Sequence, residues 1–115
     1  MRSDRYAGTS RALLEQAREE LRDGDLLQAS EKLWGAAAQA VKAVAARRGW
    51  PHDGHGKLYE VINRLVAETG DRQLRALFAY AGNLHTNFYE NWQPAEFVEQ
   101  GVEQVDDLLR RLEGL

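Results

Sequence analysis

The segment from Leu26 to Arg48 constrains the fold of this 115-residue chain more than any other. Alanine and unbranched side chains dominate it, no proline interrupts it, and such residues favour a helix because they lose little rotamer freedom there. Its apolar side chains form two adjacent rows: Leu26, Ser30, Leu33, Ala37, Ala40 and Val44 in one, and Leu27, Trp34, Ala38, Val41 and Ala45 in the other. So broad an apolar surface predicts a central helix with neighbours on several sides, with Leu33 and Val41 fully buried and Trp34 in a helix–helix interface.

The rest of the chain predicts four further helices joined by short turns. Thr9 or Ser10 is the expected cap of the first helix, which leaves residues 1–8 as a loose lead-in. Glycine followed by aspartate, at Gly24 and again at Gly70, predicts the end of one helix and the cap of the next. Pro94 suits the first turn of the last helix. No segment alternates as a strand does, so we expect a single all-α domain over residues 1–115, folded as a five-helix up-and-down bundle.

Composition narrows the function classes. The chain has no cysteine, which excludes disulfides, thiolate metal sites and a cysteine nucleophile. A net charge of −3 argues against broad, non-specific binding of nucleic acid, which needs a strongly cationic surface. Neither a signal peptide nor a membrane-spanning apolar run is apparent, so a cytoplasmic location without membrane contact is expected.

Histidines mark two candidate sites. In the loop after the central helix, His52, Asp53 and His55 have side chains that suit zinc, but three ligands on one short loop are too few and too local. We therefore interpret this loop as structural and expect no metal and no cofactor. His85 falls within the apolar stripe of the fourth helix, one turn before Tyr89. It is either a core histidine satisfied by hydrogen bonding or a functional one that faces a pocket or partner.

A row of polar residues follows the other flank of the fourth helix, at spacings of three and four: Tyr80, Asn83, Asn87 and Asn91. Asparagine is a mediocre helix former, so a solvated face or a contact surface has to explain the row. The last helix carries an acidic set that we interpret as a solvated face, because it lacks the paired histidines of a di-metal bundle: Glu99, Glu103, Asp106 and Asp107.

Two blocks of sequence resemble a known family. The central helix reads ASEKLWGAAAQAVKAVAARRG and the fourth helix ends in LHTNFYENW, a pair that is similar to the PaREP type of HEPN-like helical proteins. The resemblance covers roughly Leu26 to Trp92. It implies a five-helix bundle that dimerises, in a superfamily that contains RNA-cleaving toxins and the partners of small nucleotidyltransferases.

The RNases of that superfamily use an arginine followed closely by a histidine late in the bundle. Here His85 is the late histidine, and the preceding arginine, Arg75, is too far away. The pairs Arg47 with His52 and Arg48 with His55 fit the spacing, but they lie in the earlier loop. This departure argues against RNase activity.

Two functional hypotheses follow. The favoured one is a non-catalytic dimeric module, part of a toxin–antitoxin-like system, that binds a nucleotidyltransferase-type partner or a nucleotide-type ligand. Its expected contact surface is Tyr80, Asn83, His85, Asn87, Tyr89, Asn91 and Trp92. The alternative is a metal-independent endoribonuclease in which a histidine acts as base and an arginine stabilises phosphate charge. Its candidate residues are His85, His52, His55, Arg47 and Arg48.

Overall fold

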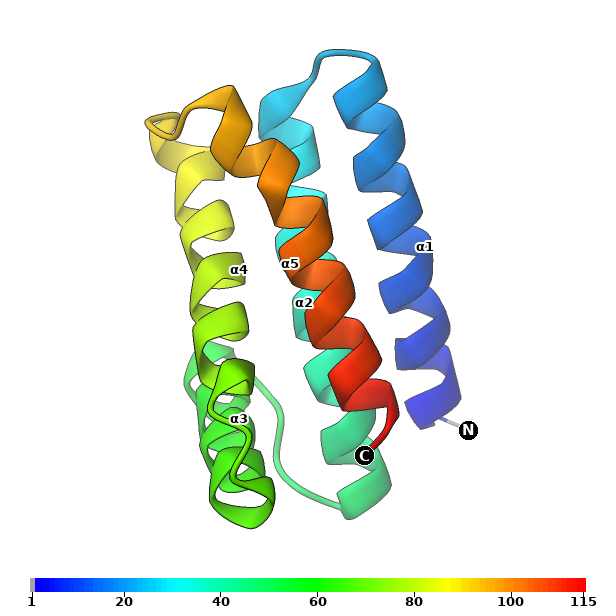
Figure 1. Cartoon of the computed structure of the whole chain (residues 1–115). Coiled ribbons are helices and arrows are strands. Elements are labelled where there is room, and N and C mark those ends of the chain that lie inside the picture. The colour runs from blue at the N-terminus through cyan, green and yellow to red at the C-terminus, as the bar shows by residue number, and fades with distance from the viewer. Residues whose placement is uncertain (1) are drawn as a thin grey trace.

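Five α-helices make up the part of the chain that the structure, a computed structural model, describes: residues 2–115 (Figure 1). They are α1 (Arg2–Arg22), α2 (Leu26–Arg48), α3 (His55–Thr69), α4 (Gln73–Glu90) and α5 (Ala95–Glu113). No strand occurs within residues 2–115. The predicted all-α five-helix bundle is confirmed.

Helix α2 lies at the centre of the bundle and packs against each of the other four helices. Leu33 and Val41 are fully buried, and Trp34 packs against Phe78 of α4, as the two apolar rows predict. Small side chains let neighbouring helices come close. A Cβ atom added at Gly35 would lie 3.1 Å from Leu13 Cδ1 on α1. The alanine-rich sequence therefore serves packing as well as helix formation.

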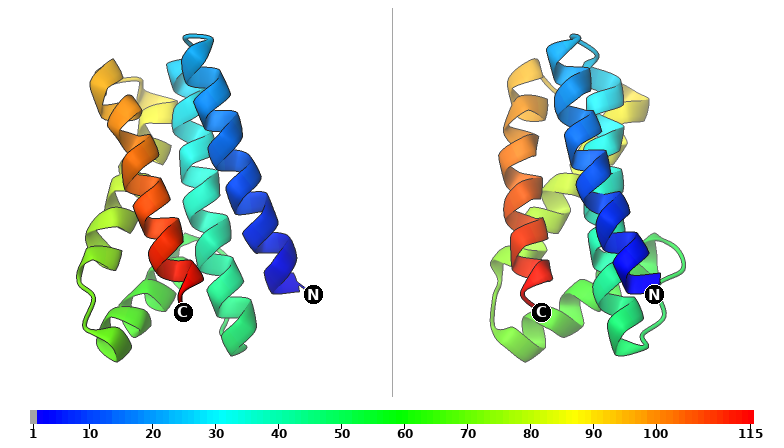
Figure 2. Two further views of the ribbon diagram at one scale, coloured as in Figure 1. Left: turned by 45° about the vertical axis from the view of Figure 1, so that its right-hand side comes forward. Right: turned by 90° about the vertical axis from the view of Figure 1, so that its right-hand side faces the viewer.

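Four of the helices alternate in direction, and α3 departs from this pattern. Figure 1 shows α1, α2, α4 and α5 running side by side, with the start of α1 and the end of α5 at the same end of the bundle. In Figure 2, α3 runs obliquely to them below α4. Among the five helices α3 contacts only α2 and α4. The loop over residues 49–54 therefore brings the start of α3 back toward the middle of the bundle.

The turns form as glycine and aspartate predict. Gly24 adopts a φ of 81°, which is accessible to glycine at little cost, and Oδ1 of Asp25 accepts a hydrogen bond from the Gln28 amide at 3.0 Å. Gly70 ends α3 with a φ of 76°, and Oδ1 of Asp71 accepts from the Gln73 amide at 3.1 Å. Pro94 caps α5, which begins at Ala95.

The start of α1 differs from the prediction. Residues 2–8 are helical, so the expected loose lead-in over residues 1–8 is wrong where the structure describes it; residue 1 lies outside that part. Ser10 is not a cap: its hydroxyl is buried and donates to the Ala36 carbonyl at 2.7 Å. This bond ties the middle of α1 to α2. The expected cap is therefore an internal contact, and the helix continues past it toward the N-terminus.

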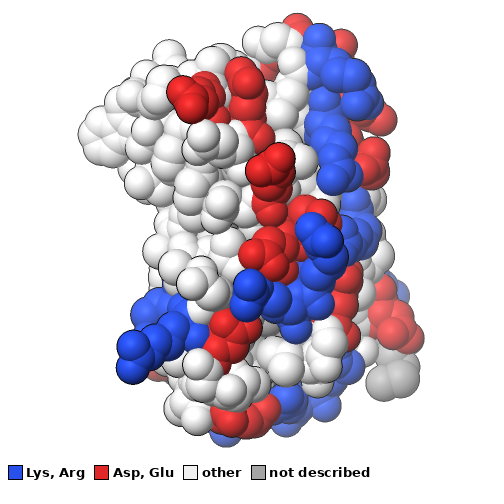
Figure 3. Space-filling model, in the orientation of Figure 1, with Lys and Arg blue, Asp and Glu red and all other residues white. Residues whose placement is uncertain are grey.

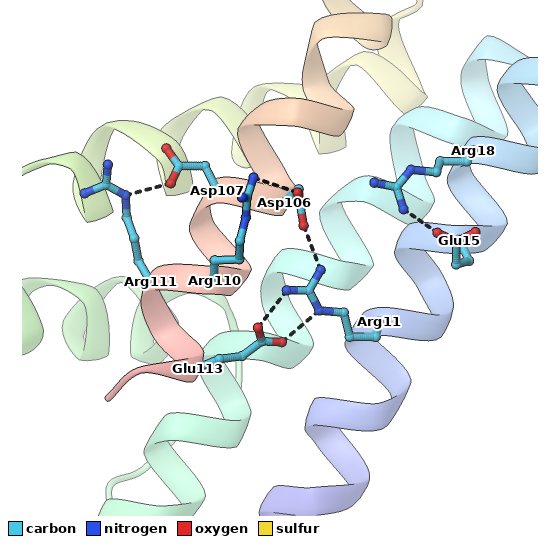
Figure 4. A network of polar contacts seen from close by, with 8 residues as sticks. All are labelled: Arg11, Glu15, Arg18, Asp106, Asp107, Arg110, Arg111 and Glu113. Atoms are coloured by element: carbon cyan, nitrogen blue, oxygen red, sulfur yellow. Dashed lines mark hydrogen bonds and ion pairs between the residues drawn. The ribbon is translucent and has the colours of Figure 1, made fainter.

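Ion pairs join α1 to α5 (Figure 4). The Arg11 guanidinium donates to both carboxylate oxygens of Glu113, at 2.8 and 2.6 Å, and to Asp106 at 2.7 Å. The prediction of a solvated acidic face on α5 therefore holds for Glu99 and Glu103, which are exposed, but is wrong for Asp106, which is partly buried against α1. We call this contact of Arg11, Asp106 and Glu113 the α1–α5 clamp.

Charge is distributed unevenly over the surface. Figure 3 shows acidic and basic side chains gathered over α1 and α5, and a largely uncharged surface over the upper part of α4. Helix α4 contributes to the difference, because its exposed charges, Arg75 and Glu90, lie toward its two ends, whereas four of its exposed residues are uncharged: Ala76, Ala79, Asn83 and Thr86. None of the five helices in residues 2–115 has both the length and the hydropathy that crossing a bilayer requires.

Candidate functional site

Aromatic and imidazole rings from three helices meet beside the first turn of α3. The His85 ring stacks on Trp34 with centroids 5.1 Å apart, and the edge of His55 meets both rings at 5.0 and 5.1 Å. Tyr89, one turn further along α4, contacts His85 edge-on at 5.4 Å. We call Trp34, His55, His85 and Tyr89 the ring cluster. The sequence places His55 and His85 in separate candidate sites, and the fold brings them together.

The ring cluster has a buried floor and an open rim. Trp34 is only 7% exposed and rests on Phe78, which is fully buried. Tyr89, in contrast, is 70% exposed, and His55 is exposed as well. A flat ligand can therefore reach rings that the protein core already holds in place.

Glu31 of α2 orients His85. Its Oε1 lies 2.7 Å from Nδ1 of His85, and both side chains are partly buried. An ionised carboxylate only accepts hydrogen bonds, so Nδ1 carries the hydrogen and Nε2 is the acceptor in the neutral ring. The Glu31–His85 pair thus fixes both the orientation and the tautomer of an imidazole that also stacks on Trp34.

His52 lies apart from the ring cluster. Its Nδ1 is 2.9 Å from the Trp50 carbonyl, and its ring meets Tyr6 of α1 edge-on at 5.6 Å. The loop histidines therefore belong to different places, His52 beside α1 and His55 beside α4. Within residues 2–115 no group of three or more histidine, cysteine, aspartate or glutamate side chains is arranged to hold a metal ion.

The two candidate arginines are also separated from the ring cluster. Arg47 donates to the Leu112 carbonyl at 3.4 Å, and Arg48 pairs with Glu68 at 2.6 Å. That hydrogen bond raises the pKa of Arg48 and lowers the pKa of Glu68. Both guanidinium groups are bound to other partners. Arg47 and Arg48 therefore form no arginine–histidine pair with His52 or His55, although their spacing in the sequence would allow one.

The expected open row of asparagines is partly wrong, because Asn87 is buried. Only 1% of it is exposed, and its side-chain oxygen accepts hydrogen bonds from the amides of Trp92 and Gln93 at 3.0 and 2.8 Å. Its amide nitrogen lies 3.4 Å from the Ser30 hydroxyl, which donates to the Leu84 carbonyl. Asn87 therefore closes the turn between α4 and α5 from within.

The other members of the row also have partners within the chain. Tyr80 stacks on Phe97 with centroids 4.3 Å apart and donates to the Phe97 carbonyl at 2.6 Å, and its burial raises the pKa of its phenol. Asn83 is exposed, and its side-chain oxygen accepts a hydrogen bond from the side-chain amide of Gln93 at 2.9 Å. Asn91 ends α4 with a φ of 54°, a left-handed conformation that asparagine tolerates. Trp92, 64% exposed, is the most open indole.

The sequence did not point to Glu31 and Trp34 as members of a site. Both belong to α2, where the sequence predicts Trp34 in a helix–helix interface and gives Glu31 no role. Glu31 and His85 are 54 positions apart in the chain. No local spacing connects them, and only the packing of α2 against α4 reveals the pair.

The fold is shared with a solved protein. A crystal structure of a protein from Sulfolobus solfataricus superposes with a TM-score of 0.81. The alignment covers 92% of this chain and 94% of that chain, at 23% sequence identity. At this identity the similarity shows a common all-α helical-bundle fold and nothing about ligands.

The profile of the archaeal PaREP1/PaREP8 family matches residues 5–109, and the chain belongs to this family. The resemblance to the PaREP family, carried by the central helix and by the end of the fourth helix, is thereby confirmed. No curated protein matches the chain. Membership by itself names no ligand and no reaction, so any function has to be argued from the ring cluster.

Proposed function

We propose that the protein is a non-catalytic helical module that binds a nucleotide-type ligand at the ring cluster. One observation supports this above all: an exposed ring, Tyr89, stands beside imidazoles that are ordered on a buried indole. Nucleobases are flat and stack on aromatic and imidazole rings, at about 1–3 kcal/mol for each base. Little order has to be created on binding, because Trp34 and Glu31 already hold His85.

Binding, rather than chemistry, also fits the distribution of charge. Cleavage of a phosphodiester benefits from a cation that stabilises the developing charge. Arg47 and Arg48, the arginines that the sequence offered for this role, have other partners. The ring cluster therefore has the groups for stacking and hydrogen bonding but not the candidate arginines.

A titration with a short single-stranded oligoadenylate, followed by fluorescence anisotropy, tests the proposal. We expect Tyr89→Ala to weaken binding roughly tenfold, since a stacked base contributes about 1–3 kcal/mol. Trp92→Ala is the matched control, because it removes another exposed aromatic ring that lies outside the ring cluster. Equal affinities of Tyr89→Ala and the parent would reject the ring cluster as the binding site.

The pair of His55 and His85 favours a second candidate, a metal-independent endoribonuclease. Their centroids are 5.1 Å apart, close enough for both to reach one phosphodiester. One imidazole would take the proton of the 2′-hydroxyl, and its oxygen would attack phosphorus. The bond from phosphorus to the 5′ oxygen would break, and the second, protonated imidazole would protonate that leaving oxygen.

Incubation with end-labelled RNA separates the two candidates. The binding module leaves the RNA intact. The enzyme produces fragments that disappear in both His55→Ala and His85→Ala and persist in His52→Ala, since His52 lies beside α1. Fragments that persist in all three variants would come from a contaminating nuclease.

The proposal extends to assembly. From the resemblance to HEPN-like proteins noted in the sequence, we propose a symmetric homodimer and a small nucleotidyltransferase as protein partner in a toxin–antitoxin-like system. The uncharged outward row of α4 supports a protein contact on that face. A nucleotidyltransferase encoded next to this protein would support the pairing, and failure of the two purified proteins to form a complex would count against it.

A further inference from the structure

A second candidate site lies beside the loop over residues 49–54, which carries His52 and leads to His55 at the start of α3. Here a hollow of about 430 Å³ opens between the start of α1 and the end of α2. Its lining includes Arg2, Ser3, Gly49, Trp50, Pro51 and His52. Figure 2 shows the loop after α2 beside the first turn of α1. The volume lies within the range of small-molecule sites, and a bare inorganic anion would leave most of it empty.

His52 has one nitrogen available for a ligand. A carbonyl oxygen only accepts, so Nδ1 of His52 carries the hydrogen that is donated to Trp50. Nε2 is then the nitrogen left for a ligand, and it becomes a donor when the ring is protonated. The edge contact with Tyr6 also holds the ring in place. The imidazole is therefore oriented before anything binds.

One cationic group lines this hollow and two more contact the indole in its wall, although the chain as a whole has a net charge of −3. Arg2 lines it, and none of the ion pairs within residues 2–115 engages its guanidinium. The Arg64 guanidinium lies 3.9 Å from the centre of the Trp50 ring. Arg48 lies 5.2 Å from the same ring, but its charge is balanced by its ion pair with Glu68. This leaves Arg2 and Arg64 as the cations that count here. The loop carboxylate, Asp53, is exposed and not part of the lining. The local charge favours an anion.

We propose that this hollow binds a small phosphate monoester whose organic group is flat and apolar. Arg2 and Nε2 of His52 would hold the phosphate oxygens, because a guanidinium fork and an imidazolium are both donors that suit this head group. Trp50 and Pro51 offer apolar contact for the flat group. The site is separate from the ring cluster: it uses His52 of the loop, whereas the ring cluster uses His55 at the start of α3 and His85 of α4.

Titration of the whole protein with phenyl phosphate, followed by NMR of the histidine and indole signals, tests the site. We expect saturable shifts at His52 and Trp50, and none at His85. Inorganic phosphate represents the phosphate group alone, and phenol represents the flat ring alone. Each should bind about tenfold more weakly than phenyl phosphate, since each lacks one set of contacts.

Two variants make the test specific. Arg2→Gln should weaken phenyl phosphate about tenfold by removing a charge-assisted contact. Arg5→Gln removes the same charge from an exposed position of α1 outside the lining, and should keep the parental affinity. His52→Phe keeps a ring beside Tyr6 but removes both nitrogens, and should also weaken binding.

Several results would overturn the site. Shifts that do not saturate at millimolar phenyl phosphate would do so, as would equal losses in Arg2→Gln and Arg5→Gln, which indicate general charge attraction. Shifts at His85 in place of His52 would move the anion to the ring cluster. Retention of the parental oligoadenylate affinity by Arg2→Gln would show that this site and the ring cluster act separately.

Discussion

Asn87 closes the turn between α4 and α5 with its side chain. Its oxygen accepts two backbone hydrogen bonds, from Trp92 and Gln93, while the residue is 1% exposed. A side chain cut back at this position leaves two amide donors near the core without an acceptor. The loss of a buried acceptor costs more than the net value of a hydrogen bond, because the donors stay desolvated.

We therefore expect Asn87→Ala to lower the free energy of unfolding by about 1–3 kcal/mol. Denaturant unfolding followed by circular dichroism measures it. Asn83→Ala is the matched control on the same helix: Asn83 is exposed and makes one side-chain bond to Gln93, so a change within about 0.5 kcal/mol is expected. Equal losses of stability in the two variants would mean that the hydrogen bonds of the Asn87 side chain do not stabilise this turn.

The regular spacing of the asparagines on the fourth helix shows that they share a face. It does not show whether that face is solvated, contacts a partner or is buried. Asn87 follows the buried Ala81 and Leu84 at intervals of three, so the inward stripe continues through it. A polar residue at such a position is predicted to be exposed to solvent unless its hydrogen-bond partners within the protein are known. Here the partners are amides of the following turn and a serine of α2, and neither is apparent before the chain is folded.

At the level of helices, the α1–α5 clamp joins the first and last helices across the bundle. The pKa of Asp106 lies below its ordinary range, chiefly because Arg11 donates a hydrogen bond to it, with a further contribution from the charge of Arg110. A carboxyl group whose pKa is lower in the folded than in the unfolded state stabilises the fold above its unfolded pKa of about 3.9. That contribution is lost as the pH falls through the folded value.

We expect Asp106→Asn to reduce stability at neutral pH by about 1 kcal/mol, the scale of a partly exposed ion pair. It should also make unfolding less sensitive to acid below about pH 4, because the group that titrates is gone. Urea unfolding across this pH range measures both effects. Asp107→Asn, which removes the neighbouring carboxylate paired within α5, should retain the parental acid sensitivity. The same flattening in both variants would argue against the clamp.

Helix boundaries followed from the sequence wherever a cap or glycine marks them. Asp25, Gly49, Gly70 and Pro94 lie at the expected ends. The start of α1 did not follow, because Ser10 has the chemistry of a cap but is used for a bond to α2. The oblique course of α3 was also not predictable, since a loop of this length leaves its direction to packing.

For the whole molecule, the candidate site could be predicted only in part. The histidines were singled out from their residue type, but the ring cluster combines residues from three helices. Trp34 and His85 are stacked because α2 and α4 are neighbours in the bundle. The sequence supplies the helices and the residues, whereas the lateral order of the helices decides which side chains meet.

The same reasoning relocates the surface on which we propose the homodimer. Asn87 is buried, so a charge placed there would disturb the core and say nothing about assembly. Four exposed residues of α4 instead form an uncharged row at helical spacing: Ala76, Ala79, Asn83 and Thr86. The exposed Arg75 lies one turn before Ala79. Depletion of charged residues is characteristic of the core of protein interfaces. A two-fold contact would bring the two copies of this row together.

We predict that the protein sediments as a dimer at micromolar concentration and that Ala79→Arg shifts it toward the monomer. Each subunit would then place a guanidinium in the contact, where desolvation and repulsion between like charges oppose association. Ala67→Arg is the matched control, because it makes the same change at an exposed position of α3 away from this row. A monomeric parent rejects the homodimer. A dimer that tolerates both Ala79→Arg and Ala67→Arg would move the interface to another face, with the charged surface over α1 and α5 the next to be tested.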